Sequence, residues 1–226
     1  MLKIDMHVHT WYSDSSASVD EVIEAAKRRG LDGVAITDHN VIDGALEAER
    51  KSDGLIIIPG EEISTLHGEL LALGIRKAVP KGLGAPETIK LVRRQGGVVV
   101  VPHPTVPFVG RLSEDAIKKL RVDGIEVFSA ITPLPGYFYK KNMELAERLG
   151  VTAVAGSDSH FPQTVGDAYT IVYVNERSLE CILDALRYGR TKVGCKPSSW
   201  IFKLRMLRGF FASLPMSLLR RPPPPL

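Results

Sequence analysis

The sequence predicts an α/β barrel, and three observations lead to this prediction. Short apolar or β-branched runs alternate with amphipathic segments along most of the 226 residues, as strands and helices do in α/β domains. Five of the six histidines lie at or just after successive apolar runs. Side chains from many strand ends converge on one point only if the sheet closes. A barrel is therefore favoured over the alternative, a doubly wound open sheet.

The first half of the chain is predicted to begin with a strand over Leu2–Val8. A helix follows over Ser18–Arg29, because Ser18 and Glu21 form a capping box and Gly30 ends the segment. Its apolar residues recur at helical spacing, which marks the face that packs on the core. The other elements predicted in this half are strands at Gly33–Thr37, Leu55–Ile58 and Leu70–Ile75, and a helix at Glu87–Arg94.

The second half continues the alternation with Val98–Val101, a fully apolar run typical of a strand buried on both faces. Further strands are predicted at Gly124–Phe128, Thr152–Ala155 and Tyr169–Val174, and helices at Ser113–Leu120, Lys140–Leu149 and Leu179–Tyr188. Such repetition predicts a parallel barrel contained in one domain, residues 1–195.

The composition limits the class of protein. An apolar content of 44% is enough for a sizeable core, and no stretch approaches the roughly 18 uncharged apolar residues of a membrane span. Lys3 and Asp5 interrupt any apolar leader. Cys181 and Cys195 match no paired zinc spacing, so reduced thiols are expected. We therefore expect a cytoplasmic protein without a transmembrane segment.

Residues 196–226 form a distinct basic segment with six basic residues and no acid. Without them the net charge of +3 becomes −3, from 23 basic and 26 acidic residues, so the barrel lacks a broad basic surface for duplex nucleic acid. We expect an amphipathic helix that covers the barrel, followed by a mobile Pro-rich tail. Contact of 200–221 with a membrane surface or a protein is the alternative. The apolar stripe of this helix is Trp200, Leu204, Leu207, Phe211 and Leu214.

Four short motifs place histidine and aspartate at or after predicted strands. Residues two apart on a strand face the same side, so the two histidines of the first motif can reach one ion. Neutral imidazole and ionised carboxylate are donors for divalent metals. One His-x-His pair alone would fit buried structural histidines equally well, but the four motifs together predict a metal-dependent enzyme. They are Asp5-Met6-His7-Val8-His9, Thr37-Asp38-His39-Asn40, Val101-Pro102-His103-Pro104 and Gly156-Ser157-Asp158-Ser159-His160.

The four motifs, with a Gly-x-Glu segment at Gly60-Glu61-Glu62, resemble the signature of the PHP (polymerase and histidinol phosphatase) superfamily over about residues 2–188. The resemblance implies a distorted (β/α)7 barrel. It also implies phosphoester hydrolysis with two or three divalent ions, Mn²⁺, Zn²⁺ or Fe²⁺. The metal ligands that it implies are His7, His9, Asp14, His39, Glu62, Glu69, His103, Asp158 and His160.

One of these positions departs from the family pattern. Relatives often have a histidine where this chain has Glu69. A carboxylate can still bind a metal and favours manganese or magnesium. His67 is the alternative ligand if the loop is shifted, although an exposed loop histidine is the simpler interpretation. Of the two acids before this segment, Glu62 matches the bridging position, and Glu61 is expected to be a solvated loop acid.

Other residues are expected to support the metal ligands or the substrate. Asp5 and Asp38 are candidates to orient imidazoles, which usually donate their second N–H to a carboxylate; a turn or helix-cap role is the alternative for Asp38. His39 and His160 are candidates to protonate the leaving group. Arg111 is a candidate phosphate clamp, with an ordinary surface arginine as the alternative.

The expected reaction is attack of metal-activated water on phosphorus, since the sequence has neither a Gly-x-Ser-x-Gly elbow nor a Walker loop. Short loops between the motifs favour a small phosphomonoester, a nucleotide or a short oligonucleotide end. Two alternatives stay open. A non-catalytic barrel could act as a scaffold in an RNA or protein assembly, but it would tolerate the loss of several ligands. A related amidohydrolase usually needs a bridging lysine, in place of which this chain offers Glu62.

Overall fold

The computed structural model describes residues 1–106 and 112–213, and side chains of the last helix as far as Met206. Arg111 and the predicted Pro-rich tail therefore lie outside the described residues.

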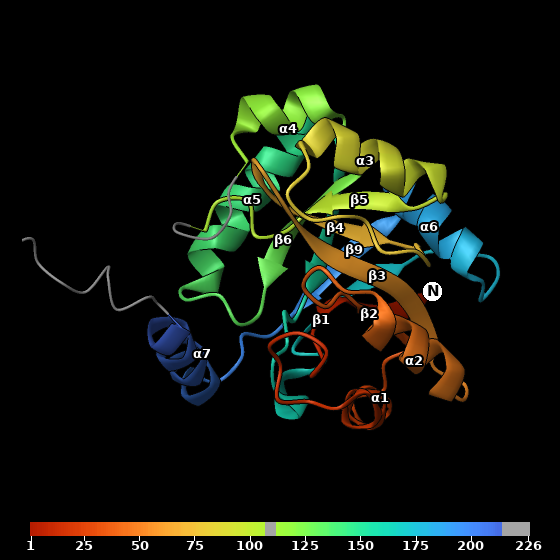
Figure 1. The fold of residues 1–226 in the computed structure, drawn as a ribbon, viewed down its shortest axis with the longest axis vertical. Coiled ribbons are helices and arrows are strands. Elements are labelled where there is room, and N and C mark those ends of the chain that lie inside the picture. Colours follow the sequence, from red (N-terminus) through yellow and green to blue (C-terminus); the bar gives the residue numbers. More distant parts are fainter. Residues whose placement is uncertain (107–111, 214–226) are drawn as a thin grey trace, which may run out of the picture.

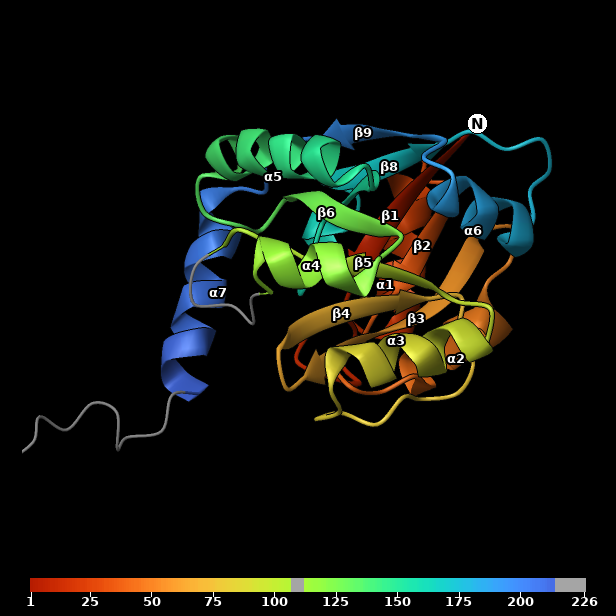
Figure 2. The same cartoon turned by 90° about the horizontal axis from the view of Figure 1, so that it is seen from above.

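One curved sheet has the strand order β7-β6-β5-β4-β3-β2-β1-β8-β9, with helices packed around it (Figures 1 and 2). The strands are β1 Leu2–Val8, β2 Gly33–Ile36, β3 Ile56–Thr65, β4 Gly68–Leu73, β5 Val98–Val101, β6 Gly124–Ser129, β7 Thr152–Gly156, β8 Ala168–Val172 and β9 Thr191–Cys195. The helices are α1 Val19–Arg28, α2 Asp43–Lys51, α3 Ala85–Arg94, α4 Glu114–Leu120, α5 Pro135–Leu149, α6 Leu179–Arg187 and α7 Trp200–Ser213, with a 3-10 turn at Pro162–Thr164.

The sheet closes at the carboxyl ends of its parallel strands, where β7 returns to β1. The amide of Asp158 donates to the carbonyl of His7 at 2.8 Å, and the amide of His9 donates to the carbonyl of Ser159 at 3.0 Å. The apolar interior lies below this closure, and α6 packs against it through Ile182 and Leu186. The predicted α/β barrel is thus confirmed, with its mouth at the closed carboxyl ends.

The expectation that all strands run parallel is wrong. β4 is antiparallel to both β3 and β5, and β8 is antiparallel to both β1 and β9. Only Leu66 and His67 separate β3 from β4, which allows a hairpin but not a crossover helix. As a consequence, the Gly-x-Glu segment is part of a long strand rather than a loop.

Two elements were not predicted from the sequence, α2 and β9. Helix α2 begins at Ile42 without a side-chain cap, and its buried residues are only Gly44, Ala45 and Ala48. It therefore lacks both the capping signal and the bulky apolar stripe that identify α1. Strand β9 pairs with β8 at the edge of the sheet, and three of its five residues are only partly buried.

The predicted C-terminal helix forms as α7, but it does not bury the predicted stripe. Trp200 is 58% exposed and Leu204 is 54% exposed. The body is contacted instead through Phe202, whose ring lies 5.4 Å from that of Phe161, and through the buried Lys203. Leu207 and Phe211 belong to the part of the helix whose side chains are not described, and Leu214 lies outside the described residues.

Candidate metal centre

Two irregularities in the sheet direct polar side chains into the mouth of the barrel. The register between β1 and β2 shifts between Asp5 and Val8, and that between β6 and β7 shifts between Glu126 and Phe128. Bulges of this kind re-aim side chains and are common beside active sites. Here the first lies at His7 and the second at Glu126. Both residues are completely or almost completely buried.

Four of the predicted ligands meet at the deepest point of the mouth, and we call them the inner cluster: His7, His9, Glu62 and Asp158. The Nε2 atoms of His7 and His9 lie 2.9 Å apart. Oε2 of Glu62 is 3.1 Å from Nε2 of His7 and 3.3 Å from Nε2 of His9. Oδ1 of Asp158 is 3.3 Å from Nε2 of His9. These atoms come from β1, β3 and the loop after β7, as strand-end ligands should.

The atoms of the inner cluster fit a bound divalent ion. His7 donates its Nδ1–H to Glu126 at 3.1 Å, so its Nε2 presents a lone pair to the other three residues. Two ring nitrogens and two carboxylates then face one another as acceptors. Such a group of acceptors needs a shared proton or a cation between its members. Two imidazoles and two carboxylates are a ligand set that Zn²⁺, Mn²⁺ and Fe²⁺ accept.

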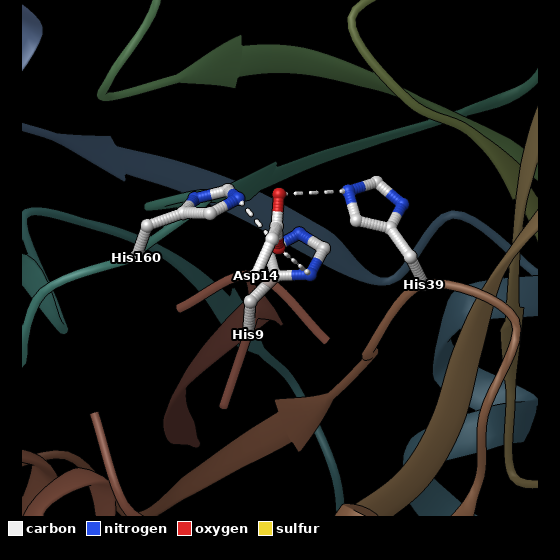
Figure 3. Close-up of side chains that lie close together, drawn as sticks. All are labelled: His9, Asp14, His39 and His160. Carbon is white, nitrogen blue, oxygen red and sulfur yellow. Dashed lines mark ion pairs between the residues drawn. The ribbon is translucent and has the colours of Figure 1, made fainter. Parts of the chain in front are cut away.

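A second group, the outer cluster, lies closer to solvent and consists of Asp14, His39, His160 and Nδ1 of His9 (Figure 3). Oδ1 of Asp14 is 3.2 Å from Nε2 of His160 and 3.9 Å from Nδ1 of His9, and Oδ2 is 3.7 Å from Nε2 of His39. Within the described residues, the buried Nδ1 of His9 has no hydrogen-bond partner. A neutral imidazole has one lone pair, so when Nε2 of His9 faces the inner cluster, its Nδ1 carries the proton and lies nearest to Asp14. Asp14, His39 and His160 then offer a carboxylate and two imidazoles to a second ion.

A third group, the lateral cluster, consists of Glu62, Glu69 and His103. Nε2 of His103 lies 3.3 Å from Oε1 of Glu62 and 3.9 Å from Oε2 of Glu69. Glu69, Glu62 and His39 can also approach one ion together. Glu62 therefore belongs to both the inner and the lateral cluster, and its Oε2 also lies 3.3 Å from Nδ1 of His39 in the outer cluster, which is the geometry expected of a bridging carboxylate.

His67 lies away from these clusters. Its side chain is exposed, and Nδ1 accepts a hydrogen bond from the amide of Ala85 at 3.3 Å, at the start of α3. The pairing of Ser64 with Glu69 fixes the register of the β3–β4 hairpin and turns Glu69 toward His103. The hairpin thus brings Glu69 to the mouth, and not His67.

The residue that orients His7 is Glu126, which the sequence analysis missed. One carboxylate oxygen accepts from Nδ1 of His7, and the other accepts from the amide of His103 at 3.0 Å. A carboxylate behind an imidazole fixes its tautomer and raises its basicity as a ligand. The sequence signal was a single acid inside the apolar run Gly124–Phe128, a position where an unpaired charge would be strongly unfavourable.

The two aspartates expected to orient imidazoles bind other groups. Asp5 accepts from the amide and hydroxyl of Ser157 and from the amide of Gly166, so it supports the loop that carries Asp158. Asp38 accepts from the amide and hydroxyl of Thr10 and from Ser13. It therefore supports the loop that carries Asp14, and it caps no helix. Both aspartates act on ligands through the backbone.

Glu61 is buried, and the expectation of a solvated loop acid is wrong. Because β3 continues through this residue, Glu61 faces away from Glu62 and lies beneath Val79, whose amide donates to Oε2 at 3.0 Å. Burial raises the pKa of Glu61 to about 7.

The electrostatics of the inner and lateral clusters call for added positive charge. Burial alone would lower the pKa of His9, but Asp158 and Glu62 raise it to about 10. Burial would raise the pKa of Asp158, but His7, His9 and His160 lower it. Burial and the nearby negative charge of Glu62 raise the pKa of Glu69 to about 7. A divalent ion would supply the charge that protons supply in its absence.

Comparison with known proteins identifies two family matches along the chain. Residues 5–101 match the PHP domain, and residues 138–191 match the PHP-associated region. An uncharacterized protein of Methanocaldococcus jannaschii is 39% identical over 142 residues, which cover 57% of this chain and 82% of that protein. A 5'-3' exoribonuclease of Haemophilus influenzae is 32% identical over 106 residues, which cover 43% of this chain and 38% of that protein.

A solved structure supports the same fold. A two-domain protein of Bacteroides vulgatus, described as containing a PHP-like metal-dependent phosphoesterase, superimposes with a TM-score of 0.73. The match covers 86% of this chain and 65% of that chain at 22% identity, so it bears on the fold alone. Among the described residues, no helix is long and apolar enough to cross a membrane.

Proposed function

This chain belongs to the PHP family of metal-dependent phosphoesterases, and we propose that it hydrolyses a small phosphomonoester, a nucleotide or a short oligonucleotide end. The observation that carries the proposal is the convergence of His7, His9, Glu62 and Asp158 on one point, with the Nε2 atoms of both imidazoles turned inward. When bound there, two or three divalent ions would polarise the phosphate oxygens and lower the pKa of a coordinated water.

The remaining residues of the centre are assigned roles by their contacts. We propose Glu62 as the bridging ligand, Glu69 and His103 as ligands on one side, and Asp14 on the other. Glu126 holds His7 in the tautomer that leaves Nε2 free. Asp5 and Asp38 hold the two loops that carry Asp158 and Asp14.

His39 is the first candidate to protonate the leaving group, in which case Asp14 and His160 would hold the outer ion; His160 is the second candidate, with His39 then a ligand. The side chain of His39 is 31% exposed, against 6% for His160, so a substrate reaches it more easily. Burial lowers the pKa of His39, which makes a bound proton easier to give up. His160 donates Nδ1–H to the carbonyl of Asp158 at 3.0 Å, and this bond fixes the direction of its Nε2.

The first test of this proposal is a panel of phosphoesters on metal-loaded protein, with Asp158→Ala as the inactive control. Loss of a proton donor slows the departure of an alkoxide more than the departure of p-nitrophenolate, which is stable without a proton. We therefore expect His39→Ala to lower turnover of a nucleoside 5'-phosphate roughly 100-fold, and that of p-nitrophenyl phosphate much less. Turnover of no phosphoester by the metal-loaded protein would contradict the proposal.

Trp11 supports a substrate with a nucleobase. It lies two residues beyond His9 and is 61% exposed. Its loop is fixed, because its amide donates to the carbonyl of Ala17 and because Asp38 binds both Thr10 and Ser13. An exposed indole on a fixed loop, two residues from a metal-ligand candidate, offers a face on which a base can stack, a contact worth roughly 1–3 kcal/mol.

The matched test of the nucleobase contact compares Trp11→Ala with Tyr188→Ala, an exposed aromatic residue that follows α6 at the far end of the barrel. We expect Trp11→Ala to raise KM for nucleotides by roughly 5- to 100-fold and to leave KM for ribose 5-phosphate unchanged. An equal rise in KM for nucleotides and for ribose 5-phosphate would assign Trp11 a structural role and would remove this support for a nucleotide substrate.

A further inference from the structure

Helix α7 presents an apolar face that nothing in the described part of the chain covers. Trp200, Ile201 and Leu204 are 58%, 63% and 54% exposed. They are spaced so that they share one side of a helix. The side toward the body holds Phe202 and Lys203, which contact the body, and Nζ of Lys203 also lies 5.6 Å from the centre of the Trp200 ring. Three large apolar side chains on one projecting helix are a contiguous patch rather than scattered exposed residues.

The start of α7 is firmly attached to the body, so the patch has a fixed position. Ser198 donates its hydroxyl to Asp167 at 2.7 Å and its amide to the carbonyl of Ala130 at 3.1 Å. Lys203 donates from Nζ to the carbonyl of Thr132 at 2.6 Å. Thr132 follows β6, and Phe161, which contacts Phe202, follows His160. The helix is therefore attached to loops at the mouth, and Figures 1 and 2 both place it away from the N-terminus and α6.

The charge around the patch has one sign. Residues 196–226 contain six basic residues and no acid, whereas the rest of the chain has a net charge of −3. Among the described residues, Lys196, which precedes the helix, and Arg205, whose guanidinium lies 5.7 Å from the centre of the Phe202 ring, are both exposed. An anionic surface is therefore attracted to this segment and repelled by the remainder of the chain.

We propose that α7, which is attached at the same end of the barrel as the metal centre, docks the protein on the surface of an anionic lipid bilayer. Tryptophan favours the bilayer interface, and a helix with apolar residues on one side and basic residues beside them lies in that interface. Nucleic acid fits less well, because Ile201 and Leu204 offer no face for base stacking. Stable attachment needs two signals, and this segment supplies an apolar patch together with basic charge.

The experiment is sedimentation of the whole chain with vesicles of phosphatidylcholine alone, and with vesicles of equal parts phosphatidylcholine and phosphatidylglycerol. We expect binding to the anionic vesicles and little to the neutral ones, with weaker binding at high salt because salt screens the basic residues. The double variant Ile201→Glu, Leu204→Glu should bind roughly tenfold less or weaker still. Arg205→Glu should weaken binding roughly fivefold. Tyr188→Glu, which changes an exposed apolar residue at the other end of the barrel, should bind like the unchanged chain.

These measurements distinguish binding of the patch to a membrane from binding of the patch to another protein surface. All the substituted side chains are exposed, and the melting temperature of each variant checks that the barrel still folds. Failure of the unchanged chain to bind anionic vesicles would overturn the proposal. It would also be overturned if the double variant bound as well as the Tyr188→Glu control. A doubled mass in solution that the double variant abolishes, without vesicle binding, would assign the patch to a second copy of the chain. The vesicle experiment does not measure phosphoesterase activity, so its result stands even if the chain hydrolyses no phosphoester.

Discussion

The inner and outer clusters use the same residue types but are built in opposite ways. The inner cluster draws on strands β1 and β3 and on residues at most two positions beyond the ends of β1 and β7, and its His7 and Glu62 are at most 1% exposed. The outer cluster is built on loops, and its Asp14 is 53% exposed. A site on rigid strands is held in place by the barrel itself, whereas a site on loops depends on secondary contacts such as those of Asp38. We therefore expect an inner ion that is tightly held and an outer ion that exchanges.

The largest expected effect is the loss of an inner ligand. Asp158→Ala or His9→Ala should lower turnover by roughly 10²–10³-fold or more, because a missing ligand displaces both an ion and the attacking water. Asp14→Ala should lower turnover less, because its carboxylate is largely solvated. Turnover numbers and metal content of the purified variants test this difference. Asp184→Ala, which removes an exposed acid paired with Arg187, is the matched control. Unchanged turnover and metal content in Asp158→Ala would show that the centre is wrongly assigned.

The next largest effect is expected from a change of Glu126, which orients His7 of the inner cluster. Glu126→Gln keeps the size of the side chain but removes the charge behind His7, and one amide cannot accept from both Nδ1 of His7 and the amide of His103. We expect metal affinity or activity to fall roughly 10–100-fold, with the fold retained. Metal titration and circular dichroism provide the measurements. Glu114→Gln, at an exposed acid paired with Arg148, should have no effect. An equal loss in both variants would point to a general charge effect.

The same comparison explains what could be predicted from the sequence. The inner and lateral ligands, apart from Glu69, lie in motifs at strand ends, where local pattern and position in the barrel agree. Glu126 was missed because a single acid in an apolar strand has no motif around it, and its meaning depends on His7, which lies 119 residues away. Asp5 and Asp38 were recognised as supporting residues, but their partners are amides and hydroxyls of distant loops that no sequence spacing identifies.

Errors in the fold have a similar origin. The antiparallel course of β4 follows from the two-residue connection after β3, a local signal that the alternating pattern obscured. Burial of Glu61 depends on the segment around Val79 folding over β3. The direction of the apolar stripe on α7 was wrong because helical spacing identifies a face but not what the face contacts. For Glu61 and α7 the missing information is tertiary.

The third prediction tests the difference in ion exchange directly. At least two divalent ions should bind per chain, because the inner and outer clusters offer separate donor sets around shared residues. During dialysis against a chelator, one ion should leave at least roughly ten times faster than the other, since a loop site with a solvated ligand opens more readily. Elemental analysis over time measures both phases. Asp14→Ala should remove the fast phase and leave the slow one. Fewer than one ion per chain at saturation would contradict a centre with several metals.

The smallest expected effect concerns the lateral cluster, where Glu69 stands in place of a family histidine. If Glu69 is a ligand, Glu69→His should keep activity within a few-fold but move the metal preference from manganese or magnesium toward zinc or iron, because imidazole suits the latter better. Glu69→Gln should be worse than Glu69→His, since a neutral amide is a weaker donor and leaves the charge of the ion uncompensated. His67→Ala should be nearly silent in activity, because its side chain is exposed and its only described hydrogen bond is to the amide of Ala85. Activity of the three variants against a series of metals decides between the two residues. A damaging His67→Ala with a silent Glu69→Gln would mean that the hairpin adopts another register in the working enzyme and that His67 is the ligand.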